Sequence, residues 1–371
     1  MYVHVPFCAR RCSYCDFSIA VRRDVPADAF ALSIGREMKI RRASEHITTL
    51  DTLYFGGGTP SRLGGEGVKR LIGTITEVTA ISPNAEVTLE ANPEDITAAS
   101  VSDWHDAGVT RLSIGVQSFN NEVLRWMHRV HDADAAVRAV HTAREGGLDA
   151  ISVDLIFALP ESLERDWQRD LDEGLALEPE HISLYGLTVE PHTPLGRWSA
   201  RGEITESPEE RYEEEFLLAH RRLGAAGFEH YEVSNFARAG KRAVHNSAYW
   251  KGVPYFAVGP SAHGFDGVER RWNISAFAAW ETAVARGTDP LEGSEMLTGE
   301  NRIAETVYLG LRTVEGLALL PNEQATVASW RDAGWVEYID TASSGRVRCT
   351  PLGWMRLDRL AADLTALRSH S

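Results

Sequence analysis

Three cysteines near the start of the chain, Cys8, Cys12 and Cys15, form a CxxxCxxC pattern. Thiolates are soft ligands that suit iron–sulfur clusters and zinc. Most protein-bound clusters and many structural zinc sites use four cysteines. Phe17, the next residue that could complete the set, cannot bind metal, and Cys349 lies near the other end of the chain. We therefore expect a three-thiolate site with one metal position open for a ligand. The alternatives are a zinc site completed by a nearby histidine, or three unconnected buried thiols.

Polar and glycine residues stand at the ends of the apolar runs that we expect to form strands. The run 52–55 leads directly into Gly56-Gly57-Gly58-Thr59-Pro60, and glycines allow positive φ and close approach of the backbone to a ligand. Glu90, Gln117 and Asp154 stand in or at the end of three further runs. Buried polar groups need partners, so each of these residues alone could simply bond to its neighbours. Several such positions along one edge of a sheet favour a polar ligand.

Strand and helix patterns alternate through the first half of the chain. The expected strands are 2–5, 52–55, 86–90, 111–115, 151–157 and 181–187. The expected helices are 27–42, 67–78, 98–107, 133–146 and 164–175. This alternation predicts an α/β fold with a parallel sheet, and six units are too few for a closed eight-fold barrel. In barrels of this kind the active-site residues lie at the C-terminal ends of the strands.

The pattern changes after residue 187. We expect a helix over 207–223 with Ser207 as N-cap and Pro208 first, and strand or loop pieces at 229–236 and 255–265. Helices at 302–311, 322–333 and 353–367, with strands at 335–338 and 347–350, suggest a small, mainly helical, winged-helix-like C-terminal domain. The predicted domains are 1–190, 191–300 and 301–371.

Composition and charge narrow the class of protein. The chain has 371 residues, 43% hydrophobic and 25% charged, as in soluble globular proteins. No apolar run approaches the roughly 20 residues that span a membrane, and we expect no export signal. Four cysteines with three clustered indicate metal binding in a reducing cytoplasm, not a disulfide framework. The formal charge of −15 disfavours nucleic-acid binding through a basic surface.

Five motifs in order along the chain resemble the radical S-adenosylmethionine (radical SAM) superfamily, in its oxygen-independent coproporphyrinogen III oxidase-like family. They are YVHVPFCxxxCxYCDF, YFGGGTPS, LEANP, RLSIGVQSF and VDLIFALP. The resemblance implies an open, partial (β/α)6 barrel in which Cys8, Cys12 and Cys15 hold a 4Fe–4S cluster. It also implies that S-adenosylmethionine chelates the open iron. The S-adenosylmethionine contacts that it implies are Tyr2, Gly57, Gly58, Thr59, Glu90, Gln117, Arg129 and Asp154. The chain departs from the family at Ala158, where glycine is more frequent.

Two features separate the oxidases of this family from its haem chaperone branch. The oxidases carry a fourth cysteine where this chain has Phe17, and an N-terminal extension that we do not expect here because the cysteine motif begins within the first ten residues. The stretch His245-Asn-Ser-Ala-Tyr-Trp250 resembles the HNxxYW motif of the chaperone branch. Histidine is a common axial ligand of haem iron, so His245, Tyr249 and Trp250 are candidate haem contacts. On the alternative view, Trp250 packs in the core and His245 bonds locally.

The resemblance to this branch implies haem as cargo, haem-acceptor proteins such as respiratory enzymes as partners, and an electron donor for the cluster. The competing hypotheses are oxidative decarboxylation of coproporphyrinogen III to protoporphyrinogen IX, and a related radical SAM methyltransferase or haem-degrading enzyme. If His245 is not the haem ligand, His263 in Gly259-Pro-Ser-Ala-His263 is the next candidate.

Overall fold

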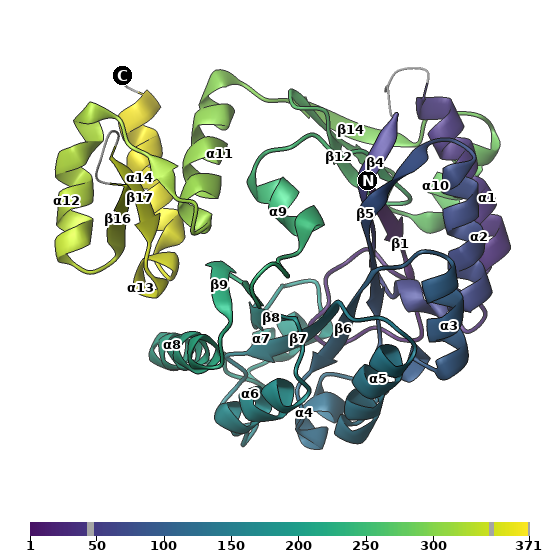
Figure 1. The fold of residues 1–371 in the computed structure, drawn as a ribbon, viewed down its shortest axis with the longest axis horizontal. Helices are drawn as coiled ribbons and strands as arrows, with labels where there is room; N and C mark the ends of the chain where they lie inside the picture. The colour runs from purple at the N-terminus through teal and green to yellow at the C-terminus, as the bar shows by residue number, and fades with distance from the viewer. Residues whose placement is uncertain (43–47, 341–344, 370–371) are drawn as a thin grey trace.

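The computed structural model describes residues 1–42, 48–340 and 345–369. Its main feature is a curved nine-stranded sheet with helices on its outer face (Figure 1). Within the described residues, no helix is long and apolar enough to cross a membrane.

Six parallel strands form the centre of this sheet in the order in which the sequence predicts them. They are β1 (Tyr2–Val5), β4 (Thr49–Gly57), β5 (Ala80–Ala91), β6 (Arg111–Gln117), β7 (Ile151–Phe157) and β8 (His181–Gly186). Neighbours in this order pair in parallel, which places their C-terminal ends at one edge of the sheet. The predicted partial (β/α)6 barrel is therefore confirmed.

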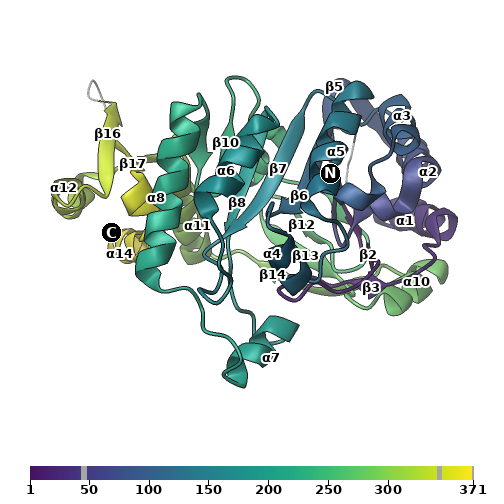
Figure 2. The same ribbon diagram turned by 90° about the horizontal axis from the view of Figure 1, so that it is seen from below.

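Helices connect these strands and cover the outer face (Figures 1 and 2). They are α1 (Ala27–Arg41), α2 (Gly64–Thr76), α3 (Ala98–Asp106), α4 (Asn121–Trp126), α5 (Ala133–Glu145) and α6 (Trp167–Ala176). Their apolar faces pack on the sheet, and Phe30, Leu71 and Val140 are fully buried there. A short helix after β8, α7 (Pro194–Ala200), projects from the body in Figure 2.

Strands from later in the chain extend both edges of the sheet. At one edge β11 (Ala257–Val258) pairs in parallel with β1. At the other, β10 (Asn235–Ala237) pairs antiparallel with β8, and β9 (Glu229–Glu232) pairs with β10. The expected strand piece at 229–236 therefore belongs to the main sheet, whereas the piece at 255–265 contributes β11 to the main sheet and its last three residues to a smaller one. The six-strand pattern could not indicate this, because pairing between distant strands is not visible in local periodicity.

The remaining elements form two smaller sheets and the helices around them. One sheet contains β12 (His263–Phe265), β13 (Glu269–Asn273) and β14 (Leu291–Met296), and the other β15 (Leu317–Ala318), β17 (Arg346–Cys349) and β16 (Val336–Asp340). The helices of this half are α8 (Glu209–Ala225), α9 (Val244–Trp250), α10 (Phe277–Ala285), α11 (Gly299–Arg312), α12 (Gln324–Asp332), α13 (Pro351–Trp354) and α14 (Leu357–Ser369). Three 3-10 turns lie at Pro60–Leu63, Pro93–Asp95 and Pro321–Glu323.

Two details differ from the sequence-based expectation. Helix α8 begins at Glu209, with Pro208 as its N-cap, and the hydroxyl of Ser207 has no hydrogen-bond partner among the described residues. The expected Ser207 cap is wrong because Pro208 is extended, with ψ 151°, and so lies outside the helix. The expected final helix is split into α13 and α14.

A buried carboxylate ties α1 to the segment that carries β11 and α10. Glu37 is fully buried and accepts hydrogen bonds from the Gly259 amide (2.9 Å), Asn273 Nδ2 (2.6 Å) and Trp280 Nε1 (2.8 Å). Arg41, one turn along α1, forms an ion pair with it at 3.2 Å. Burial raises the pKa of Glu37, which Arg41 opposes. This network fixes the edge of the barrel that bears β1.

Candidate functional site

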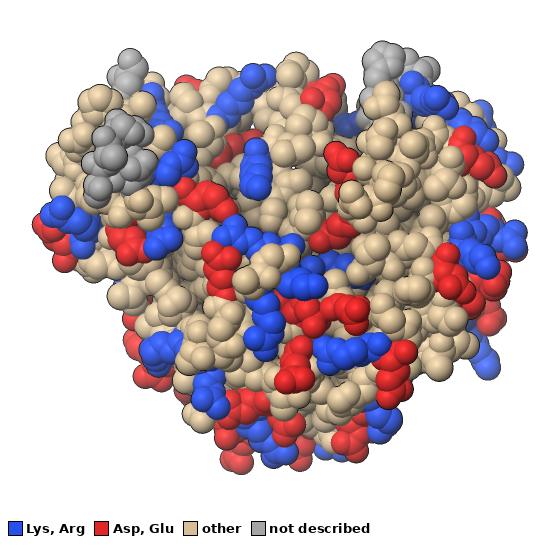
Figure 3. Space-filling model, in the orientation of Figure 1, with Lys and Arg blue, Asp and Glu red and all other residues tan. Residues whose placement is uncertain are grey.

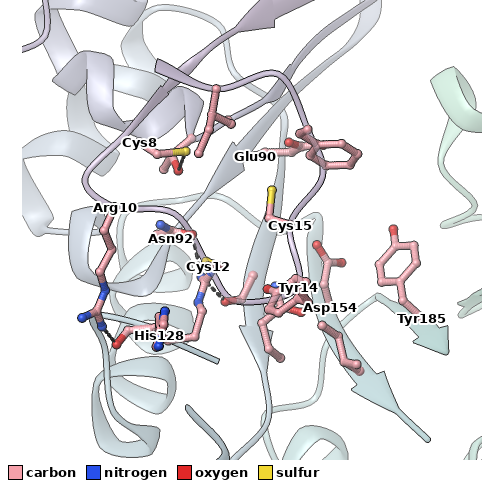
Figure 4. Close-up of a pocket in the computed structure, with 18 of the residues that line it drawn as sticks. Cys8, Arg10, Cys12, Tyr14, Cys15, Glu90, Asn92, His128, Asp154 and Tyr185 are labelled. Carbon is pink, nitrogen blue, oxygen red and sulfur yellow. Dashed lines mark hydrogen bonds between the residues drawn. The ribbon is translucent and has the colours of Figure 1, made fainter. Parts of the chain in front are cut away.

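A cavity of about 490 Å³ opens at the C-terminal edge of the parallel strands. It brings together residues from all of the predicted motifs of the barrel: Cys8, Cys12, Cys15, Gly57, Gly58, Thr59, Glu90, Gln117, Arg129 and Asp154. The close-up in Figure 4 shows Cys8 beside Glu90, and Cys15 between Glu90 and Asp154. Ten of the predicted site residues therefore share one cavity.

The loop that bears the cysteines is held at both ends. Short strands β2 (Phe7–Cys8) and β3 (Ala20–Val21) pair in parallel on either side of it. Cys8 is buried and its Sγ lies 3.4 Å from Thr59 Oγ1. Arg129 donates from Nη1 to Cys12 Sγ at 3.7 Å. The cysteine loop thus contacts Thr59, next to the glycine turn, on one side and Arg129, in the loop after α4, on the other.

Three thiols at the cavity, those of Cys8, Cys12 and Cys15, are the candidate ligands of a cluster. All four cysteines are free thiols, and only Cys349 lies away from the cavity. Burial raises the pKa of Cys8, and it raises the pKa of Cys15 to about 11. These thiols are therefore protonated near neutral pH, and metal binding must release their protons. Among the described residues, no three His, Cys, Asp or Glu side chains are grouped closely enough to hold a metal ion.

The glycine turn after β4 is packed against the first strand. Gly57 has φ +111°, and a Cβ there would lie 2.6 Å from the His4 ring. A Cβ on Gly58 would lie 2.7 Å from the carbonyl carbon of Pro6. We expected glycine at these positions because a ligand needs the room. The structure gives a second reason, which is close packing against the first strand. Neither position has space for a side chain against the protein itself.

Glu90 is the carboxylate that reaches the cavity from β5. Its Oε1 accepts a hydrogen bond of 2.7 Å from the Tyr54 hydroxyl, and its Oε2 accepts one of 3.2 Å from the Gly57 amide. Burial raises the pKa of Glu90 to about 7, an effect that the Tyr54 hydrogen bond opposes. Near neutral pH this group can hold or release a proton, which suits contact with a cationic ligand.

Asp154 on β7 lies in a group of serine hydroxyls. Ser113 donates to its two oxygens at 3.1 and 2.9 Å, and Ser152 donates at 3.2 Å. Ser152 also contacts His181 Nδ1 at 2.8 Å, and His181 Nε2 lies 2.8 Å from the Tyr231 hydroxyl. Burial raises the pKa of Asp154 to about 6. The serines hold the carboxylate facing the cavity.

Gln117 and Arg129 also line the cavity. Gln117 ends β6 with φ +69°, a backbone conformation that non-glycine residues rarely adopt and that is concentrated at functional sites. Arg129 is 9% exposed, and its Nη2 donates to Asn92 Oδ1 (2.6 Å) and to the Gly115 carbonyl (2.8 Å). Its Nε is buried and has no hydrogen-bond partner in the described part of the chain. An unpartnered cationic donor at a cavity suits an anionic ligand group.

Four predicted residues do not line this cavity. Tyr2 has its hydroxyl 3.1 Å from His4 Nδ1 and its ring stacked on Tyr54, with ring centres 6.1 Å apart. His245, Tyr249 and Trp250 belong to α9, which packs against β4. The structure thus separates the residues predicted for haem from those predicted for the cluster.

His245 is buried and both of its ring nitrogens have partners. Nδ1 lies 2.7 Å from Thr52 Oγ1 and Nε2 lies 2.8 Å from the Tyr249 hydroxyl. The imidazole stacks on Tyr54 with ring centres 5.0 Å apart. Burial lowers the pKa of His245 to about 3. In this arrangement neither nitrogen is free to bind iron, so its predicted role as a haem ligand stays a prediction that requires α9 to move.

Several cavity residues were not predicted. Tyr14, Asn92, His128 and Tyr185 line the cavity together with Phe17 and Arg10. Asn92 stands two residues after Glu90 in the LEANP motif, directly after the end of the strand. This position could have identified it as a cavity residue from the sequence. His128 lies in the loop after α4, where no local pattern indicated a cavity.

Comparison with known proteins identifies the family. Residues 2–173 match the model of the radical SAM superfamily. The heme chaperone HemW of Mycobacterium tuberculosis is 37% identical over 322 residues, which cover 86% of this chain and 83% of that protein. HemW of Bacillus subtilis is 35% identical over 318 residues, covering 85% and 84%.

A solved structure agrees in fold. The radical SAM enzyme coproporphyrinogen III oxidase (HemN) of Escherichia coli superposes with a TM-score of 0.80 at 23% identity, covering 97% of this chain and 88% of that one. At this identity the likeness concerns the fold alone. The sequence relatives establish that the chain belongs to the HemW family of radical SAM proteins.

Proposed function

We propose that this protein is a radical SAM haem chaperone, which binds a 4Fe–4S cluster, S-adenosylmethionine and haem and delivers haem to target proteins. The observation that carries the proposal is the single cavity that holds the three cysteines, the glycine turn, Glu90 and Asp154. The names of the similar proteins, heme chaperone HemW, support haem as the cargo.

In this proposal each part of the cavity has a task. Cys8, Cys12 and Cys15 would hold the cluster, which would supply the one-electron chemistry that reductive cleavage of S-adenosylmethionine needs. The Gly57–Thr59 turn and Glu90 bind the amino-acid and ribose parts of S-adenosylmethionine. Gln117, Arg129 and Asp154 orient the remainder, and the Arg129 guanidinium offers its unpartnered Nε to an anionic group. Tyr2 has no direct contact with the ligand in this proposal and instead supports the ring of Tyr54, on which it stacks.

The partners follow from the same proposal. A haem chaperone needs acceptor proteins, such as respiratory enzymes, and the cluster needs an electron donor. We place these exchanges in the cytoplasm, in agreement with three clustered free thiols.

The competing function is oxidative decarboxylation of coproporphyrinogen III, which the shared fold with HemN makes worth testing. Phe17 argues against it, because it occupies the place of the fourth cysteine and is 58% exposed at the cavity. A related radical SAM methyltransferase or haem-degrading activity would also use the cavity.

One experiment separates these functions. Purified, reconstituted protein is titrated with haem, and is separately incubated anaerobically with reductant, S-adenosylmethionine and coproporphyrinogen III. We expect a Soret band that saturates near one haem per chain, and no protoporphyrin product. Catalytic formation of protoporphyrinogen IX would overturn the chaperone proposal, and so would failure to bind haem. Methylated products or cleaved haem would point to the related enzymes.

A further inference from the structure

A second hollow lies on the other side of α9 from the barrel interior. It consists of two adjoining cavities of about 470 and 510 Å³, which share Trp250, Lys251, Leu309, Gly310 and Gly316. We call it the Trp250 groove. One wall is α9 with the residues that follow it, and the other is α11 with the turn that follows it. Each cavity has the volume of an ordinary small-molecule site.

Much of the wall of the Trp250 groove is apolar. Val244 and Val253 are 54% and 45% exposed there, and Leu309 faces them from α11. Phe265, Leu297 and Leu317 extend the apolar surface in the adjoining cavity. The indole Nε1 of Trp250 is buried and has no hydrogen-bond partner within the described residues. Leaving such a donor unpaired costs free energy.

Cations outnumber anions around the groove, although the whole chain carries a charge of −15. The basic lining residues are Arg242, Lys251, Arg302, Arg346 and Arg368, and the acidic ones are Glu305 and Glu315. On the face shown in Figure 3, blue and red side chains are interspersed in the hollow between the C-terminal elements and the barrel.

Two of these cations are available to a ligand. Arg242 is paired with Glu229 and Glu315, and Arg368 with Glu323. The side chains of Lys251 and Arg302, in contrast, make no ion pair or hydrogen bond with other described residues. An apolar hollow with two unpaired cations suits an apolar molecule that carries carboxylates.

The groove offers no ordinary haem-iron ligand. Histidine, cysteine and methionine are absent from the described residues that line it. Tyr231 reaches its edge, but its hydroxyl already contacts His181 Nε2 at 2.8 Å and accepts from the Ala243 amide at 3.3 Å. A tetrapyrrole held here would be recognised by its ring and its carboxylates.

We infer that the Trp250 groove is the haem-binding site, and that it binds the ring against Trp250 and the carboxylates at Lys251 and Arg302 without an axial ligand from the protein. This inference rests on the proposed function, because it takes haem as the cargo. It gives Trp250 a role that its buried neighbour His245 does not share.

The test compares three ligands by fluorescence quenching of the tryptophans and by absorbance: haem, metal-free protoporphyrin IX and protoporphyrin IX dimethyl ester. Binding to a groove without an iron ligand predicts similar affinities for the first two. The ester lacks the carboxylates, so we expect it to bind at least tenfold more weakly. A metal-free ring that binds far more weakly than haem would overturn the inference, because it would reveal an iron ligand.

Variants locate the site. Lys251→Glu combined with Arg302→Glu should weaken haem binding at least tenfold, while Lys69→Glu, an exposed change on α2, should not. Unaltered cluster content and thermal unfolding would show that the double variant folds. If it binds haem as the wild type does, the groove is not the site, although the proposed function stands. If the wild type binds no haem, the proposed function itself fails.

Discussion

The Tyr54 hydroxyl donates a 2.7 Å hydrogen bond to Glu90, while the ring of Tyr54 stacks on His245. One side chain therefore connects the cavity carboxylate with the helix that carries the HNxxYW motif. Thr52 and Tyr249 form hydrogen bonds with the two ring nitrogens of His245. The imidazole is therefore held in one orientation, and the Tyr54 ring packs on it. This arrangement gives His245 a structural task that requires no haem.

Replacing Tyr54 tests that connection. Tyr54→Phe retains the stacked ring but removes the hydrogen bond to Glu90. A hydrogen bond to a charged group contributes roughly 1.5–3 kcal/mol, so we expect S-adenosylmethionine to bind about tenfold or more weakly in equilibrium dialysis. Cluster content should not change, because Tyr54 lies outside the cysteine loop. Unchanged affinity would mean that Glu90 does not contact the ligand.

Replacing His245 tests its role as a haem ligand. His245→Ala leaves Thr52 and Tyr249 without their shared partner and opens a space beneath Tyr54, so we expect a loss of roughly 2–4 kcal/mol of stability. Urea unfolding measures this loss. Haem affinity should be retained under conditions where the variant is folded. Loss of the Soret band from folded protein would instead assign His245 to the iron.

The pKa of Glu90 predicts a pH dependence of stability. Its value is raised from 4.5 to about 7 in the folded protein. Between these values the folded state holds more protons than the unfolded state, so the free energy of unfolding falls as pH rises from about 4.5 to about 7. In protein without ligands, Glu90→Gln should therefore be more stable than the wild type above pH 7, by about 1–3 kcal/mol.

That difference should disappear below about pH 4.5, where the wild-type carboxyl is protonated in both states. Urea unfolding at a series of pH values measures it. Glu122→Gln is the matched control, because Glu122 is exposed on α4 and should show little dependence. If the free energy of unfolding of Glu90→Gln differed from that of the wild type by the same amount at every pH, the shifted pKa would be contradicted.

The cysteines differ in their expected contribution to the cluster. Cys12→Ala should abolish iron binding, whereas Cys349→Ala should retain about four irons per chain after anaerobic reconstitution. Cys349 is buried in β17, far from the cavity in sequence and absent from its lining. Iron and sulfide assays decide the outcome. A fully loaded Cys12→Ala variant would refute the three-thiolate site.

Ala158 offers a stabilising substitution. It has φ +55°, and its amide donates to Glu215 Oε2 at 2.7 Å, which keeps the backbone in this conformation. A left-handed conformation costs a non-glycine residue roughly 1–2 kcal/mol, so Ala158→Gly should raise the free energy of unfolding by about 0.5–1 kcal/mol. Ala362→Gly, at an exposed position in the interior of α14, should lower it by about 1 kcal/mol. Chemical denaturation of both variants measures the contrast.

Much of the barrel followed from local patterns, whereas the arrangement around α9 did not. Strand β7 was predicted with its observed bounds, because its run of apolar residues is flanked by clear helix signals. The polar residue in that run, Asp154, signalled a cavity correctly. In contrast, β13 contains Arg270, Arg271 and Trp272 without regular alternation, so it was not predicted. His245 was ambiguous because burial and bonding depend on β4, far away in the sequence.

Strand β1 lies between β4 and β11 in the sheet, although all the other strands of this sheet come between β1 and β11 in the sequence. A ribosome delivers β1 and the cysteine loop long before β11, and domains form as units during synthesis. Until β11 arrives, the outer edge of β1 has no partner and Glu37 lacks the Gly259 amide. Nascent chains halted before β11 should therefore leave the cysteine loop open to protease, and stable loading of iron should follow the release of the later segment.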